Sequence, residues 1–227
     1  MQAARLSADS LAATLAATLP QQARVVVADQ APVEFELLPG ELPALTGMTE
    51  VRRREFTSGR YCARAALAAL GLPAEPVPKA STREPVWPPG IVGSISHAAG
   101  LAAAAVGYSL QMTGLGIDLE TDEPLDRKLV AMICRPEERA WLSEKSDPSS
   151  MAKVMFSAKE STYKCIWPEV RQFVDFQDVR VSLDPGAGTF KAFARSNSLP
   201  EDALAGLVGH FFRQGGLLVT SACIPTP

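Results

Sequence analysis

The chain has 227 residues, 47% of them hydrophobic, and a formal net charge of −3 at pH 7. This length can bury a substantial core in one large domain or two small ones. No apolar run approaches the roughly 20 residues that a membrane-spanning helix needs, so a membrane span is not expected.

The cysteines and histidines exclude several kinds of site. Four cysteines are scattered without a C-x-x-C pair, which argues against a zinc ribbon, a thioredoxin-like motif and a compact disulfide framework. The two histidines, His97 and His210, are too few for a histidine-rich transition-metal site. We therefore expect a cytoplasmic protein with reduced cysteines.

Charge is distributed unevenly along the chain. Residues 51–83 contain seven basic and two acidic side chains, whereas acidic side chains crowd between Asp118 and Asp126. A basic segment and an acidic cluster suit a phosphorylated ligand with a metal ion. Binding of nucleic acid would need a wider basic surface, so no nucleic-acid partner is expected.

The first predicted element is an amphipathic helix close to the N-terminus. Leucines recur between residues 6 and 19, Asp9 or Ser10 can act as the N-cap, and Pro20 lies beyond the end. A weak signal peptide is the alternative for this stretch, but the acidic Asp9 favours the helix.

Short strands are predicted over residues 25–28 and 33–37, followed by a loop. A long helix is expected over residues 49–70, because Thr49 can cap it and Gly71 can end it. Six prolines between Gly71 and Pro89 then force an extended loop. This loop carries Arg83 and Trp87.

The rest of the chain alternates between strands and helices. Strands are predicted over residues 91–96, 101–108, 114–120, 178–183 and 189–194, with two more within 207–224. Helices are predicted over residues 126–134, from Pro136 onward and over 151–167, the last capped by Ser149 or Ser150 and stopped by Pro168. Each half, 1–113 and 114–227, thus has one long helix and several strands, which predicts an α+β fold.

The predicted strand over residues 114–120 carries two carboxylates. Side chains alternate along a strand, so Asp118 and Glu120 point to one face while Ile117 and Leu119 face the core. Taken alone, the pair is also compatible with a solvent-facing strand edge. Gly114 and Gly116 do not form a dinucleotide-binding motif, because the third glycine is missing and no helix follows at once.

A third carboxylate lies on the second long helix. Glu160 and Lys164 are four residues apart and share a face, so on their own they could form an ordinary surface ion pair. Together with Asp118 and Glu120, however, Glu160 would complete a set of three oxygen ligands. Such a set suits Mg²⁺, which usually fills its remaining positions with water and substrate phosphates.

The end of the predicted strand over residues 91–96 carries small hydroxyl residues followed by a histidine. Ser96 and His97 could meet a phosphate there, although a structural histidine is the more common finding for a lone His. A Ser-His hydrolase is a poor rival, because the chain contains no G-x-S-x-G nucleophile elbow.

Three blocks of the sequence, in this order, resemble the Sfp-type 4′-phosphopantetheinyl transferases. They are Trp87-Pro88-x-Gly90-Ile91-x-Gly93-Ser94-Ile95-Ser96-His97, Gly116-Ile117-Asp118-Leu119-Glu120 and Phe156-Ser157-Ala158-Lys159-Glu160-Ser161-x-Tyr163-Lys164. The first block, with Gly59-Arg60-x-x-x-Arg64 upstream, resembles the enterobactin-synthetase branch.

The resemblance implies a monomer of two similar α/β halves, a pseudo-dimer, with coenzyme A bound between them. It implies that Mg²⁺ is held by Asp118, Glu120 and Glu160. It further implies that Lys164 acts in catalysis with Glu160 as the candidate base, and that coenzyme A contacts Arg52, Arg60, Arg83, Ser96, His97 and Lys164.

The implied reaction transfers 4′-phosphopantetheine from coenzyme A to a serine of an apo carrier protein, for siderophore or other secondary-metabolite synthesis. The carrier would dock on an exposed part of the basic segment or on an apolar patch near the cleft. Another magnesium-dependent nucleotide transferase lacks support, because no phosphate-binding P-loop is present. A non-catalytic module that binds coenzyme A or a carrier protein remains the alternative.

Overall fold

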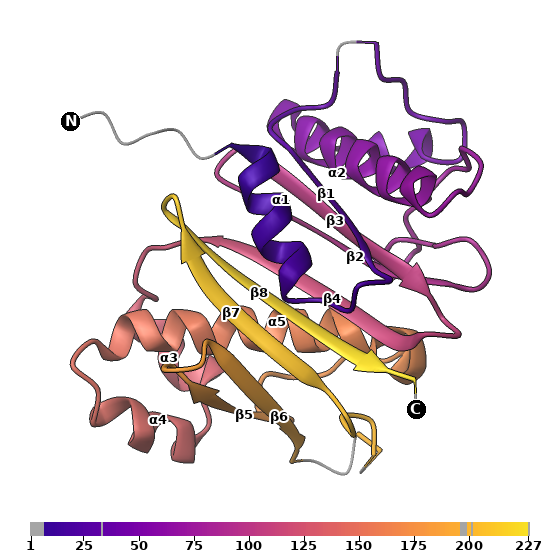
Figure 1. Ribbon diagram of the computed structural model, residues 1–227. Helices are drawn as coiled ribbons and strands as arrows, with labels where there is room; N and C mark the ends of the chain where they lie inside the picture. The colour runs from indigo at the N-terminus through magenta and orange to yellow at the C-terminus, as the bar shows by residue number, and fades with distance from the viewer. Residues whose placement is uncertain (1–6, 33, 196–198, 201, 227) are drawn as a thin grey trace.

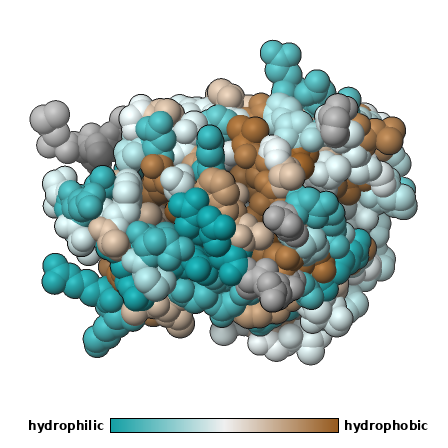
Figure 2. Space-filling view, turned by 90° about the horizontal axis from the view of Figure 1, so that it is seen from below, coloured by the Kyte–Doolittle hydropathy of each residue, from teal (hydrophilic) through white to brown (hydrophobic). Residues whose placement is uncertain are grey.

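The computed structural model describes residues 7–32, 34–195, 199–200 and 202–226. Its described part contains five α-helices and two antiparallel sheets, which confirms the α+β prediction. None of the described helices combines the length and the apolar composition needed to cross a membrane. On the face drawn in Figure 2, hydrophilic side chains lie next to separate apolar areas.

The N-terminal part is built around a three-stranded sheet with the order β1-β3-β2. In chain order its elements are α1 (Ala8–Ala17), β1 (Arg24–Ala28), the short 3₁₀ helix η1 (Leu42–Leu45), α2 (Glu50–Ala69), β2 (Ile91–Ala98) and β3 (Leu101–Tyr108). The alanines of β3 are small enough to let α2 pack closely on the sheet, with Ala63 and Leu67 in the shared core. Thr49 caps α2 as predicted, by accepting a hydrogen bond from the backbone N–H of Arg52.

The C-terminal part is built around a five-stranded sheet with the order β4-β8-β7-β6-β5. Its elements are β4 (Met112–Thr121), α3 (Arg127–Ile133), α4 (Pro136–Ser143), α5 (Pro148–Val170), β5 (Val179–Asp184), β6 (Thr189–Ala194), β7 (Val208–Gln214) and β8 (Leu217–Pro225). Figure 1 shows α5 running behind this sheet, while α3 and α4 lie at the lower left, near β5.

Two serines join the sheets where β2 meets β4. Ser94 Oγ accepts a hydrogen bond from Ile117 N at 3.0 Å and donates to Ile117 O at 3.4 Å. One pleat further, Ser96 Oγ accepts from Leu119 N at 3.0 Å. Between these two strands, side-chain hydroxyls form the hydrogen bonds that backbone groups form within a sheet. They satisfy buried peptide groups of β4. We call this contact the β2–β4 seam.

The first helix covers the place where the two sheets meet. Leu11 and Leu15 of α1 are fully buried in a core cluster that also contains residues of β1, β3, β4 and β8. Thr18 Oγ1 lies 2.8 Å from Ser221 Oγ of β8, which ties the end of α1 to the C-terminal sheet. Figure 1 shows α1 lying in front of both sheets.

Helix α5 approaches β4 so closely that only glycine fits at two positions. A Cβ atom at Gly116 would lie 1.9 Å from the carbonyl oxygen of Ser161, and one at Gly114 would lie 2.3 Å from that of Cys165. Both distances are far below van der Waals contact. The two glycines therefore fix how near α5 comes to the strand that carries Asp118.

One predicted strand is wrong. Residues 34–37 form no strand, and Val33 of the same prediction lies outside the described residues. The chain turns here instead, with Phe35 N donating to Pro32 O. Phe35 packs edge-on against Tyr61 and beneath the guanidinium of Arg64, so the segment is held to α2 by its side chains.

The ends of two helices also differ from the prediction. The N-cap of α1 is Ser7 rather than Asp9 or Ser10, because the Ser7 side chain accepts a hydrogen bond from Ser10 N. Helix α5 begins at Pro148 after the N-cap Asp147 and continues through Pro168 to Val170. A proline in the last turn removes only one backbone donor, so the helix can continue past it.

Candidate active site

Asp118 lies buried at the β2–β4 seam and is the most heavily hydrogen-bonded of the three predicted carboxylates. Its Oδ1 accepts hydrogen bonds from Lys164 Nζ at 2.7 Å and from Ser96 Oγ at 3.1 Å. Its Oδ2 accepts from Ser157 Oγ at 2.8 Å. Only 4% of Asp118 is exposed. Asp118 therefore does not lie on a solvent-facing strand edge. Its carboxylate joins β4 to β2 and to α5.

Lys164 is fixed by three acceptors on the same seam. Besides Asp118, its ammonium group lies 3.1 Å from Ile117 O and 3.3 Å from Ser96 Oγ. Because an ammonium group has three protons, all of them have a partner. These bonds fix the position of the ammonium group at the β2–β4 seam. Lys164 therefore does not form the simple surface ion pair with Glu160 that helical spacing also allowed.

Glu120 and Glu160 extend the acidic site outward from Asp118. Glu120 Oε2 forms an ion pair with Lys153 Nζ at 2.7 Å. Burial raises the pKa of Glu160, the Lys164 ammonium group opposes this, and the charges of Asp118 and Glu120 raise the pKa further. The three carboxylates thus act on one another electrostatically, as groups that share a site do.

A divalent cation fits the chemistry of these donors. Three carboxylates face two ammonium groups, those of Lys153 and Lys164, so one negative charge is left without a counter-charge. Hard cations such as Mg²⁺ prefer carboxylate oxygen. Among the described residues, however, no group of three or more His, Cys, Asp or Glu side chains lies together closely enough to hold a metal ion. The donors are suitable in kind, while two of them are paired with lysines.

Beside the carboxylates, α5 faces a cavity of about 610 Å³. Glu160 and Lys164 line it together with side chains of the proline-rich loop and of β2. Trp87 and Trp167 give it apolar walls. The indole N–H of Trp87 donates to Gly93 O, whereas that of Trp167 is buried and has no partner among the described residues. The cavity therefore offers apolar surface next to charged groups, as ligand sites commonly do.

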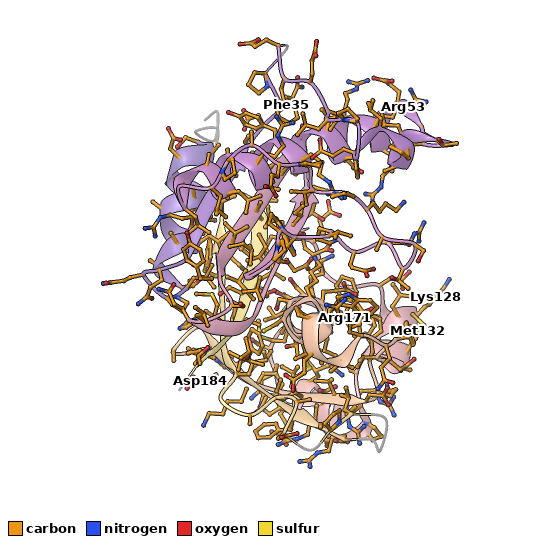
Figure 3. All side chains as sticks on the ribbon, turned by 90° about the vertical axis from the view of Figure 1, so that its right-hand side faces the viewer. Phe35, Arg53, Lys128, Met132, Arg171 and Asp184 are labelled. Atoms are coloured by element: carbon orange, nitrogen blue, oxygen red, sulfur yellow. The ribbon has the colours of Figure 1, made fainter. Side chains whose placement is uncertain are left out.

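Two arginines of the cavity have positive φ. Arg83 in the proline-rich loop has φ 83° and Arg171 at the end of α5 has φ 49°. This conformation is uncommon for residues other than glycine and often marks functional positions. Figure 3 shows Arg171 at the end of α5 that faces the viewer. The Arg83 conformation is held by a hydrogen bond from its N–H to Ala80 O at 2.9 Å.

The predicted contacts His97 and Arg52 lie together in a second cluster. Arg52 Nη1 is 2.5 Å from His97 Nε2 and 3.0 Å from Glu55 Oε2. Burial lowers the pKa of His97; Glu55 opposes this, and the positive charges of Arg52 and Lys164 lower it further. The Arg52 guanidinium is the fixed positive charge of this cluster, with Glu55 as its counter-charge and the His97 ring beside it.

Arg60 lies deeper than a ligand contact at the surface would. It is 5% exposed, stacks over the Phe56 ring and donates to Pro78 O at 3.5 Å. Burial lowers its pKa to about 10, with the nearby Glu41 acting in the opposite direction. Its Nε is buried and has no partner in the part of the chain that the structure describes.

Sequence reasoning missed several side chains of this site, namely Ser157, Lys153, Trp167 and Arg171. A signal existed for Ser157, which lies seven residues before Lys164 and hence on the same helix face two turns away. Lys153 likewise lies seven residues before Glu160 on the same helix face, whereas its pairing with Glu120, 33 residues away in the chain, has no local signal.

Comparison with known proteins gives matches in both parts of the chain. The model of the 4′-phosphopantetheinyl transferase N-terminal domain matches residues 41–107, and that of the 4′-phosphopantetheinyl transferase superfamily matches residues 114–204. The second match includes all three carboxylates and Lys164.

Individual relatives have related names. The chain is 35% identical over 166 residues to the 4′-phosphopantetheinyl transferase Npt of Nocardia iowensis, covering 70% of this chain and 75% of the relative. It is 35% identical over 196 residues to the 4′-phosphopantetheinyl transferase Svp of Streptomyces mobaraensis, covering 84% and 80%. Enterobactin synthase component D of Salmonella typhi is 38% identical over 114 residues, which is 50% of this chain and 47% of the relative.

Proposed function

Because this chain belongs to the 4′-phosphopantetheinyl transferase superfamily, we propose that the β2–β4 seam and the adjoining cavity are its active site. The protein transfers 4′-phosphopantetheine from coenzyme A to a carrier protein. The observation that carries the site proposal is the Asp118–Lys164 ion pair of 2.7 Å, which lies beside a cavity that Lys164 and Glu160 line.

In this reaction the hydroxyl oxygen of the carrier serine attacks the β-phosphate of coenzyme A. The new serine–phosphate bond replaces the bond between the two phosphates, and 3′,5′-adenosine bisphosphate leaves with the electron pair. The proton of the serine goes to a base. Negative charge accumulates on the phosphate oxygens, so positioning and fixed positive charge should dominate catalysis.

The roles of the charged side chains follow from their surroundings. Lys164 holds its ammonium group at a fixed point, where it can stabilise the phosphate oxygens without reorganisation. Glu160 faces the cavity, and no hydrogen bond or ion pair to its carboxylate is found in the described part of the chain, so it is available as the base. Arg52 and His97 would bind a further phosphate of coenzyme A, and Arg83 lines the cavity from the proline-rich loop.

Asp118, Glu120 and Glu160 are the proposed ligands of Mg²⁺. When bound, Mg²⁺ would neutralise charge on the pyrophosphate oxygens. The excess of one negative charge over Lys153 and Lys164 supports this assignment.

Magnesium binding can be measured without turnover. We expect millimolar MgCl₂ to raise the Tm of the wild-type protein, because a ligand that binds only the folded state stabilises it. Glu160→Gln should abolish the shift, while Glu144→Gln, at the exposed end of α4, should retain it. Equal shifts in the wild type and in Glu160→Gln would contradict the ligand assignment.

The carrier is proposed to belong to siderophore or other secondary-metabolite synthesis, which the likeness to enterobactin synthase component D supports over half of this chain. A panel of apo peptidyl, aryl and acyl carriers, each incubated with the protein, coenzyme A and Mg²⁺, would identify it by gain of mass. Gain on acyl carriers alone would contradict the siderophore proposal. No relative described above supports a non-catalytic module.

We also propose that the chain works as two halves, 1–113 and 114–227. The separate sheets support this division; β4, which carries Asp118, belongs to the second sheet and starts two residues before the boundary, with an irregular register between Met112 and Gly114. The site then lies where the halves meet.

A further inference from the structure

Next to Glu160 on α5 lies a buried lysine that takes no part in the proposed chemistry. Consecutive residues of an α-helix point about 100° apart, so Lys159 and Glu160 face different surroundings. Glu160 lines the cavity, whereas Lys159 is 3% exposed and points towards α4 and β5. A buried charge is costly, so its partners should explain why it is there.

The ammonium group of Lys159 is fully hydrogen-bonded. It donates to Ile133 O, Glu138 Oε2 and Phe176 O, each at 2.8 Å. These acceptors come from the end of α3, from α4 and from the connection that leads to β5. One side chain of α5 therefore holds three separate segments.

Glu138 completes this network from the other side. Its Oε1 accepts from Val181 N at 2.6 Å, and its Oε2 accepts from Arg135 N at 2.7 Å as well as from Lys159. Glu138 is 2% exposed. The ion pair thus links α5 to the start of α4 and to β5, with every bond between 2.6 and 2.8 Å.

A buried ion pair is a poor device for stability alone. Removing two charges from water costs free energy that their attraction only partly returns, and a well-packed apolar pair of similar size is often as stabilising or more so. Unlike an apolar contact, a fully hydrogen-bonded pair fixes the distances and angles between the segments that it joins. Because Lys159 is the residue next to Glu160, the pair also affects the orientation of Glu160 in the site.

The two faces of α5 are held differently. On the seam side, Ser157 and Lys164 bind Asp118, whereas the carboxylate of Glu160 has no hydrogen bond or ion pair of its own among the residues that the structure describes. The aim of Glu160 therefore depends on the rotation of α5 about its axis. Lys159 and Glu138 restrain that rotation from the opposite side.

We infer that Lys159 and Glu138 are positioning residues, which fix the rotation of α5 and thereby aim Glu160 into the active site. The inference rests on the proposed active site. The described residues that line the active-site cavity include neither of them.

The test replaces the pair by neutral side chains of similar size. Glu138→Gln/Lys159→Met keeps an acceptor for a backbone N–H and removes both charges together, so no buried charge is left unpaired. We expect a folded protein whose kcat falls by about tenfold or more, because small displacements of reacting groups are costly. KM for coenzyme A should change by less than about threefold, since the nucleotide contacts lie elsewhere. The control Glu144→Gln/Lys191→Met neutralises one exposed charge of each sign, at the end of α4 and on β6, and should retain the wild-type kcat.

A second variant keeps the charge. Lys159→Arg retains the pair with Glu138 but cannot direct three donors as an ammonium group does. We expect its kcat to fall as well, with Tm measured alongside. A kcat within twofold of wild type in either folded variant would overturn the inference. Loss of folding in both variants would also overturn it, since the pair would then be needed for folding. If the wild type itself adds no mass to any apo carrier, the proposed function fails, which is distinguishable from failure of the positioning role.

Discussion

At the scale of single residues, the burial of Asp118 is the feature with the widest consequences. A buried carboxylate is tolerated when it is paired and hydrogen-bonded, and Asp118 accepts bonds from Lys164, Ser96 and Ser157. Truncation to alanine would remove the charge and also leave Ser96 and Ser157 without their acceptor. An isosteric amide removes the same charge but keeps the shape and part of the hydrogen bonding, so it is a sharper probe of this position than alanine.

His97 allows a prediction about pH. Its pKa is lowered in the folded protein, chiefly by burial, while in the unfolded chain it has the ordinary value of about 6.5. Below that pH the unfolded chain binds a proton that the folded protein resists, so this residue makes the free energy of unfolding fall as the pH decreases.

We expect His97→Gln to lose less stability than the wild type between about pH 7.5 and about pH 5.5, because only the wild type carries this proton linkage. Urea unfolding of both proteins at the two pH values would measure the difference. An identical loss of stability in both proteins would show that the pKa of His97 is not lowered in the folded state.

At the scale of elements, the distance between α5 and β4 is set by glycine. A methyl group at Gly116 would meet the backbone of Ser161, which cannot move without shifting the helix. We expect Gly116→Ala to destabilise the protein by about 1–3 kcal/mol or more. Activity of the folded fraction should also fall, since Lys164 and Glu160 lie on the displaced helix.

Gly186 provides the matched control. A Cβ there would lie 3.4 Å from Asp184 Oδ1, and the residue is exposed in the turn between β5 and β6. Gly186→Ala should change the free energy of unfolding by no more than about 0.5 kcal/mol. Thermal or urea unfolding of both variants decides the point; similar stability of the two would mean that α5 can move away from β4 at little cost.

The elements also show how far sequence reasoning reaches. Strand alternation correctly placed Ile117 and Leu119 in the core, and the Thr49 cap and Gly71 correctly bounded α2 to within a residue. Both are local patterns. The strand predicted over residues 33–37 is wrong at its described residues 34–37, because Phe35 packs against Tyr61 of α2, a tertiary contact that the local pattern does not show.

Parts of the site could not be predicted because their partners lie far apart in the chain. Ser94 and Ser96 serve β4 through hydrogen bonds to peptide groups more than twenty residues away, and nothing in their own surroundings indicates this. Lys159 is similar, because its partner Glu138 lies on another helix. By contrast, the Glu160–Lys164 spacing correctly indicated that both side chains share a face, since both line the cavity.

At the scale of the whole molecule, the fold brings three segments of the chain to one seam. β2 supplies hydroxyl groups, β4 supplies Asp118 and Glu120, and α5 supplies Lys164 and Glu160, while α1 covers the junction of the sheets from the other side. Mutations that separate the sheets should therefore affect catalysis as well as stability. A monomeric state and a cytoplasmic location stay predictions.

We propose that the buried Asp118–Lys164 pair lies in the site of phosphopantetheine transfer. The most direct measurement compares wild type with Asp118→Asn in single-turnover reactions with coenzyme A, Mg²⁺ and an apo carrier, followed by the gain in carrier mass. We predict that the wild type modifies the carrier and that the folded variant is slower by about 10²-fold or more, because a fixed charge of the site is lost. A folded Asp118→Asn protein that modifies the carrier at the wild-type rate would contradict the account.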